Sequence, residues 1–225
     1  ASVKLWYRLL NCGFRIPGAA GTDCFLNRIS SLPPGWGRAY VRLTNGLAYK
    51  DWIAGLRAGH SFVSNGPMLE FSAEGKGPGE TIHLEIPRGV RVRATARSQY
   101  PMERLELVYN GRVALTGKLA EDRLSASIDG ELKIEGSGWV AVRADGPPPQ
   151  YHIGTRLSAH TSPAHIEVKE RKADAKADAE FFLAWIDRLE TALRRRNRVP
   201  VGMAHVESLL AAARSIYREI IKRAK

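Results

Sequence analysis

Asp23 is the residue of this sequence whose position most clearly suggests chemistry. It ends a run of mostly small residues, RIPGAAGTD at 15–23, and a short strand is expected near 15–21. α/β enzymes place metal ligands and bases at the carboxyl ends of their strands. The spacing therefore makes Asp23 a candidate metal ligand. The alternative is structural, because Asp often caps the turn that follows it.

A second candidate region is the stretch GHSFVSNGP at 59–67. Its central residues, 61–64, are expected to form a strand that follows a short amphipathic helix beginning near Tyr49. His60 and Asn65 flank this strand and are candidate substrate-binding residues. The alternatives are an exposed histidine and, for Asn65, a turn formed by Asn-Gly-Pro.

The remaining reactive side chains predict no self-contained catalytic set. His160 and His165 are five residues apart, and an odd spacing on a strand sends side chains to opposite faces, so a shared metal is not expected. His160 is expected to be buried and hydrogen-bonded. The chain has two cysteines and no C-x-x-C spacing, and it lacks a phosphate-binding loop, a nucleophile elbow and an H-E-x-x-H helix. Trp36 and Tyr40 flank a glycine-rich loop and are expected to line a pocket or to fill a core.

The charge is strongly basic but is not arranged as in nucleic-acid-binding proteins. The 225 residues carry 34 Lys and Arg against 23 Asp and Glu, a formal net charge of +11. Arginines alternate with apolar residues over 88–97, as on the solvent face of a half-buried strand, and others cluster at 194–198. Neither stretch interleaves aromatic residues. Nucleic acid is therefore not favoured as a partner, although a polyanion-binding module stays an alternative. No apolar run approaches the roughly 18 residues of a membrane helix, so a membrane partner is not expected.

The order of expected elements predicts an α+β chain in three parts. Residues 1–67 read as a helix and short α/β units, the incomplete remnant of a β/α barrel. Residues 68–170 contain short alternating segments and two hairpin dipeptides, Asn110-Gly111 and Asp129-Gly130, typical of an antiparallel, immunoglobulin-like β-sandwich. Residues 171–225 carry two apolar stripes separated by a break at 197–202, which predicts a helical hairpin. The expected strands are 38–43, 61–64, 68–73, 81–86, 89–97, 104–109, 112–116, 124–128, 131–135, 138–144 and 164–168.

Several motifs occur together in one order: GTD at 21–23, YKDWI at 49–53, SFVSNGP at 61–67 and AHTSP at 159–163. With the FFxxWID pattern at 181–187, they resemble the C-terminal half of PHP-like metallohydrolases related to carbaryl hydrolase, over nearly the whole chain. Asp23 matches the late barrel aspartate of that family and is the one metal ligand that carries over. Two residues later, where PHP domains commonly have a histidine, this chain has Phe25.

The resemblance implies a metal-dependent hydrolase acting on an ester, carbamate or phosphoester of a small-molecule substrate. Its distorted barrel would hold divalent ions, zinc, manganese or iron, mostly through ligands upstream of this chain. The chain would then be a C-terminal fragment, inactive alone, whose partner is the missing N-terminal barrel portion. Residues 1–66 would expose apolar surface, which could also drive self-association. His60 stands where the family more often has Arg or Lys, which favours a substrate-facing or simply exposed residue. The rival interpretation is a non-catalytic β-sandwich that serves in binding or assembly.

Overall fold

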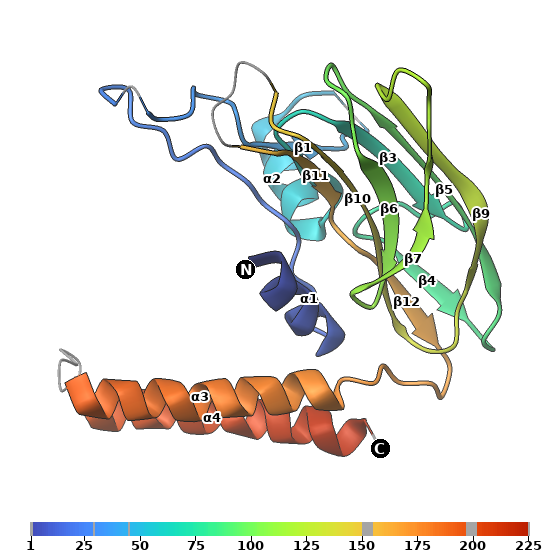
Figure 1. Ribbon diagram of the computed structural model, residues 1–225. Coiled ribbons are helices and arrows are strands. Elements are labelled where there is room, and N and C mark those ends of the chain that lie inside the picture. Colours follow the sequence, from blue (N-terminus) through green and yellow to red (C-terminus); the bar gives the residue numbers. More distant parts are fainter. Residues whose placement is uncertain (1, 29, 45, 150–154, 197–201, 225) are drawn as a thin grey trace. The chain divides into compact units, whose positions relative to one another are not determined.

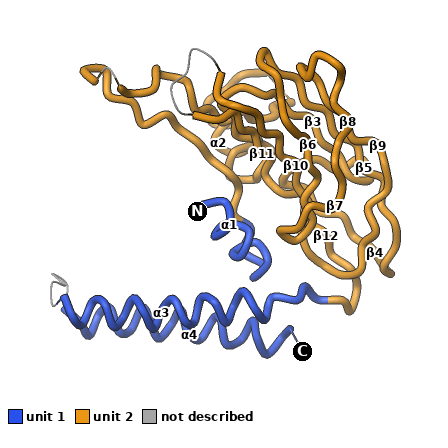
Figure 2. The backbone as a smooth tube through the Cα atoms, viewed as in Figure 1, with its two compact units in different colours: residues 1–15, 172–225 blue, residues 16–171 orange. Residues whose placement is uncertain are grey.

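The structure is a computed structural model that describes residues 2–28, 30–44, 46–149, 155–196 and 202–224 (Figure 1). The chain divides into two compact units (Figure 2). The larger unit, 16–171, contains two packed β-sheets and a helix, and the smaller unit, 1–15 with 172–225, is helical. The predicted α+β class with a C-terminal helical pair is therefore confirmed.

The first sheet of the larger unit has eight strands. Along one edge of its central strand, β10, lies β6, and along the other edge β11 and β12 follow one another. All neighbouring pairs are antiparallel except β12 with β4. The strands are β1 (Arg38–Val41), β2 (Ser61–Ser64), β4 (Thr81–Leu84), β6 (Arg104–Tyr109), β7 (Arg112–Thr116), β10 (Gly138–Gly146), β11 (Leu157–Thr161) and β12 (Ala164–Val168).

The second sheet has four strands in the order β3-β5-β9-β8. These are β3 (Met68–Ala73), β5 (Gly89–Arg97), β9 (Ser125–Lys133) and β8 (Lys118–Leu119). Along β5, valine and alanine side chains are buried while the residues between them are exposed, the alternation of a sheet with one face on a core. That core lies between the two sheets and includes Leu69 and Phe71 of the second sheet and Leu107 and Val142 of the first. The antiparallel sandwich is thus confirmed, and the described strands form no closed barrel.

Three strand predictions were wrong. Residues 14–25 form no strand. The strands expected at 124–128 and 131–135 are one continuous strand, β9, because Asp129 pairs with Arg93 of β5 instead of turning. By contrast, Asn110 and Gly111 do form the turn between β6 and β7, with φ of 48° and 82°, as a two-residue hairpin requires. No strand was predicted at β11, Leu157–Thr161.

The helical unit consists of α1 (Ser2–Asn11), α3 (Lys176–Arg196) and α4 (Met203–Arg223). Phe182 of α3 stacks on Tyr217 of α4 with ring centroids 5.0 Å apart, and Cys12 and Ala179 are buried beside Phe182. Arg214 of α4 bonds Asp187 and Glu190 of α3. The predicted break at 197–202 lies, except for Gly202, outside the described residues.

The two compact units have different boundaries from the predicted segments 1–67, 68–170 and 171–225. The helix over 2–11 groups with the C-terminal helices, and β1 and β2 extend the first sheet of the sandwich. The remaining helix, α2 (Tyr49–Ala58), lies between β1 and β2 in the sequence, begins at Tyr49 as predicted, and ends at Gly59, whose φ is 77°. None of the helices within the described ranges is long and apolar enough to cross a membrane.

Candidate functional site

Asp23 lies in the irregular segment that connects α1 to β1. Its backbone is left-handed, with φ of 50°, a conformation that Asp tolerates better than most residues. Its side chain is exposed and, among the residues that the structure describes, accepts no hydrogen bond and forms no ion pair. The turn-capping alternative is therefore not realised here.

The backbone on either side of this segment is tied to the sandwich. The Thr22 hydroxyl accepts a hydrogen bond from the Gly37 amide at 3.0 Å, and the Gly18 amide donates to the Ser162 hydroxyl at 3.0 Å. Ser162 is 1% exposed and also bonds Ser61 through its hydroxyl. These hydrogen bonds hold the backbone that precedes Asp23, while its carboxylate has no bonding partner among the described residues.

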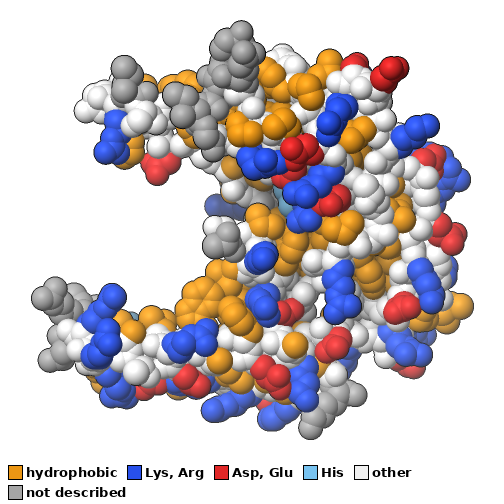
Figure 3. All heavy atoms as spheres, viewed as in Figure 1, with side chains coloured by type: hydrophobic (Ala, Val, Ile, Leu, Met, Phe, Trp, Pro, Cys, Tyr) orange, Lys and Arg blue, Asp and Glu red, His pale blue; other side chains and the backbone are white. Residues whose placement is uncertain are grey.

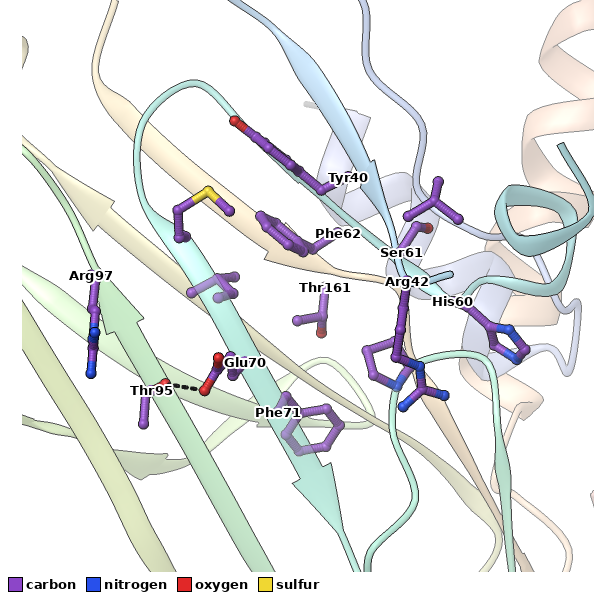
Figure 4. A pocket seen from close by; sticks show the side chains of 14 residues that line it. Tyr40, Arg42, His60, Ser61, Phe62, Glu70, Phe71, Thr95, Arg97 and Thr161 are labelled. Atoms are coloured by element: carbon purple, nitrogen blue, oxygen red, sulfur yellow. Dashed lines mark hydrogen bonds between the residues drawn. The ribbon is translucent and has the colours of Figure 1, made fainter. Parts of the chain in front are cut away.

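A groove with a volume of about 610 Å³ lies where β1 and β2 of the first sheet meet β3 of the second, and this part of the sandwich is called the open end (Figure 4). Tyr40 of β1 and Phe62 of β2 stack on one wall, with ring centroids 4.8 Å apart and planes within 9°. The opposite side is formed by β3, from Met68 to Phe71. An apolar wall with few polar groups is typical of ligand-binding sites. Of the two aromatic residues expected to line a pocket or fill a core, Tyr40 lines this groove, whereas Trp36 is buried at 9% exposure.

Polar groups line the rim of this groove. Arg42 donates to the Glu80 carboxylate at 3.1 Å, and the backbone amide of Gly77 donates to the same carboxylate at 2.8 Å. These two donors, the amide first, lower the pKa of Glu80, so the ion pair persists well into the acidic range. Arg97 lines the groove beside β3, and its guanidinium forms no ion pair within the described part of the chain. The rim therefore presents one paired and one available cation.

His60 is half-buried and lines the groove. Its backbone amide bonds the Gly55 carbonyl, and its carbonyl accepts from the Arg42 amide. Gly79 packs against this region so closely that a Cβ there would collide with the Ala58 carbonyl oxygen. The structure thus places His60 where a bound ligand could be reached, as the substrate-facing prediction requires. That role stays a prediction.

Asn65 does not line the groove. Its side-chain amide donates to the Arg156 carbonyl at 2.8 Å, and its side-chain oxygen accepts from the Ser158 amide at 2.7 Å. Its backbone amide bonds the Ser158 carbonyl as well. The side chain therefore continues the pairing of β2 with β11 beyond the end of β2. The structure does not bring Asp23, His60 and Asn65 together around one cavity.

His160 is buried, as predicted, at 7% exposure. Its Nδ1 lies 2.7 Å from the Thr161 carbonyl, which can only accept, so Nδ1 carries the proton. Burial, aided by the nearby Arg143, lowers the pKa of His160 to about 4. The imidazole is therefore neutral near pH 7.

The prediction that His160 and His165 face opposite sides was wrong. Arg143 pairs with His160 and Trp139 with His165, and cross-strand partners share a face. Both histidines therefore lie on the face shared by Arg143 and Trp139. The alternation fails because one extra residue bulges between β11 and β12.

Charges on the sandwich are mostly matched by neighbours of opposite sign. On the face drawn in Figure 3, basic and acidic side chains are interspersed over the surface. Arg91 contacts Asp129, Arg88 contacts Glu74, and Arg143 contacts Glu106. The alternating arginines of β5 are exposed as predicted. The charges of Arg88, Arg91 and Arg143 are therefore neutralised locally by neighbouring carboxylates.

No group of three or more His, Cys, Asp or Glu side chains is placed to hold a metal ion within the described ranges. Two of the residues that form the groove, Arg42 and Leu69, were not candidates from the sequence, because they come from strands that only folding brings together. A search of family models, curated proteins and solved structures finds no match to this chain.

Proposed function

We propose that this chain is the C-terminal portion of a PHP-like, divalent-metal-dependent hydrolase acting on ester, carbamate or phosphoester bonds. Asp23 would be its contribution to the metal site. The supporting observation is that the backbone around Asp23 is tied to Gly37 while the carboxylate stays exposed and unpaired among the described residues. A carboxylate held in this way is available to a ligand that another part of the protein helps to bind.

Residues 1–67 would be the last α/β units of the barrel in this proposal. Four large apolar side chains in this stretch are prominently exposed: Phe25 at 55%, Leu26 at 88%, Leu47 at 88% and Tyr49 at 78%. An upstream barrel portion, or a second copy of the chain, would cover such surface. Divalent ions supply the chemistry in such enzymes by lowering the pKa of bound water and polarising the scissile bond. The part assigned to this chain is to hold Asp23 in place.

Metal content measured by mass spectrometry tests this proposal. The measurement compares this chain with a longer protein that includes the upstream barrel portion. Each protein is measured with and without the substitution Asp23→Ala. Asp51→Ala is the matched control, since Asp51 is also exposed. Stoichiometric divalent metal in the longer protein, lost in the Asp23 variant and kept in the Asp51 variant, is the expected result. A metal-free longer protein would exclude the hydrolase.

The groove supports a second candidate function, a non-catalytic binding module. Its stacked Tyr40 and Phe62, together with Arg97, suit a ligand with a flat apolar part and an anionic group. Benzoate is a simple probe of this chemistry. Titration of the ¹⁵N-labelled chain should shift the amides of Phe62 and Thr161, and Phe62→Ala should abolish the response while Phe25→Ala leaves it unchanged. An equal response in both variants would remove the groove as the site.

A further inference from the structure

The two sheets of the sandwich differ in extent, eight strands against four. At the groove, β1 and β2 of the larger sheet continue beyond β3, the edge strand of the smaller sheet. Tyr40 and Phe62, which stack on the groove wall (Figure 4), are therefore only partly buried. In the closed part of the sandwich, residues at equivalent positions are almost fully buried.

The free edge of β3 carries unpaired backbone groups. On an antiparallel strand, alternate residues bond to opposite neighbours. The Glu74 amide bonds β5, whereas both backbone groups of Ala73 bond Lys76 on the other side. By alternation, Leu69 and Phe71 also direct their N–H and C=O groups away from β5. Neither residue has a hydrogen-bond partner on that side within the described part of the chain, and both line the groove.

The available edge is short. At one end the turn that bonds Ala73 to Lys76 closes it. At the other end β3 begins at Met68, directly after Pro67, which has no N–H to donate. The edge therefore accommodates three residues of a partner strand, opposite Leu69, Glu70 and Phe71.

We infer that this edge binds a short extended peptide segment with an apolar–basic–apolar pattern, which adds a fifth strand to the smaller sheet. The two apolar side chains would face inward onto Tyr40 and Phe62. The basic side chain would lie on the outer face beside Glu70, which is exposed and accepts one hydrogen bond, from Thr95 at 3.2 Å. Strand addition of this kind combines main-chain hydrogen bonds with alternate side-chain pockets. The inference deepens the binding function of the groove and is independent of a metal at Asp23.

Charge disfavours a second copy of the chain as the occupant. Two β3 edges that paired through Leu69 and Phe71 would place Glu70 directly opposite Glu70 of the partner copy, and like charges in that position are destabilising. The same position favours Lys or Arg in a peptide, because the arginines of β5 lie one strand further away. Glu70 therefore selects the basic residue and opposes self-pairing through this edge.

Hydrogen exchange of the ¹⁵N-labelled chain, followed by NMR, tests the inference. The probe is acetyl-Ser-Val-Lys-Val-Ser-amide, and saturation should slow exchange of the Leu69 and Phe71 amides by about tenfold or more. A peptide with Glu in place of Lys should bind about fivefold more weakly. The Glu70→Lys variant, changed at an exposed position, should reverse this preference. A peptide N-methylated at both valines should not bind, because those amides face β3.

Three outcomes would overturn the inference. The first is unchanged exchange at Leu69 and Phe71 with saturating peptide, and the second is a charge preference that Glu70→Lys does not reverse. The third is protection of the same amides by raising the chain concentration alone, which would identify a second copy as the occupant. Benzoate binding at Phe62 without any peptide binding would retain the groove as a binding site and remove only this inference.

Discussion

The closed part of the sandwich and its open end are built from the same kinds of strands but differ in what covers them. In the closed part, β5 and β9 face β6 and β10, and Leu107, Val140 and Val142 are all 0% exposed. At the open end, β1 and β2 extend past β3, the edge strand of the smaller sheet as far as the structure describes it, and Tyr40 and Phe62 stay half-buried along a groove. The same pleat thus produces a core where two sheets overlap and a binding surface where one sheet extends past the other.

Truncations in the two parts should differ most in unfolding free energy. Leu107→Ala is expected to cost about 3 kcal/mol, because it removes buried methyl groups and leaves a cavity in a closed core. Phe62→Ala should cost less, about 1 kcal/mol, because that ring is only partly buried and its loss leaves no closed cavity. The measurement is a urea titration with hydrogen exchange of the β10 amides as its readout. Because β10 lies in the larger unit, this readout reports on the unfolding of that unit. Equal losses would mean that the open end is covered in solution.

His160 lies on β11, the strand between the closed part and the open end. The pH dependence of stability tests whether water is excluded from its imidazole. The unfolded chain takes up a proton near pH 6.5, while burial delays protonation of folded His160 until about pH 4. Stability should therefore be unaffected above pH 6.5 and fall by about 3 kcal/mol between these two values. His160→Gln should abolish this fall, whereas the exposed His83→Gln should retain it. Denaturation curves at pH 7, 5.5 and 4.5 provide the measurement, and parallel losses in both variants would show a solvated junction.

Asn65 holds the connection from β2 to β3 at the open end. Asn65→Ala removes two side-chain hydrogen bonds to the backbone at 156 and 158, at an expected cost of about 2 kcal/mol. Exchange of the Ser158 amide should accelerate at the same time. Asn27→Ala, at an exposed position, is the control. Unchanged stability with altered ligand binding would instead support the substrate-binding prediction.

Local patterns were enough for most of the fold. The period-two alternation along β5 and the Asn110-Gly111 turn depend on neighbours in the sequence, and both were predicted correctly. Asp129-Gly130 has equally good turn chemistry, yet it lies inside β9 because nine consecutive residues of that strand pair with β5. Register with a neighbouring strand outweighs the preference of a dipeptide, and no local rule contains that register.

The candidate sites show the same division. From the sequence, His160 was expected to be buried, and the alternation of the sandwich strands followed from their own side chains, since burial of apolar residues is encoded residue by residue. The tertiary structure alone decided that His160 and His165 share a face, that both ends of the Asn65 amide serve the backbone, and that Leu69 and Phe71 leave an open edge opposite Tyr40 and Phe62. These features depend on which strands meet, on one bulged residue and on the unequal extent of two sheets, and such long-range pairings are set by the packing of the whole unit.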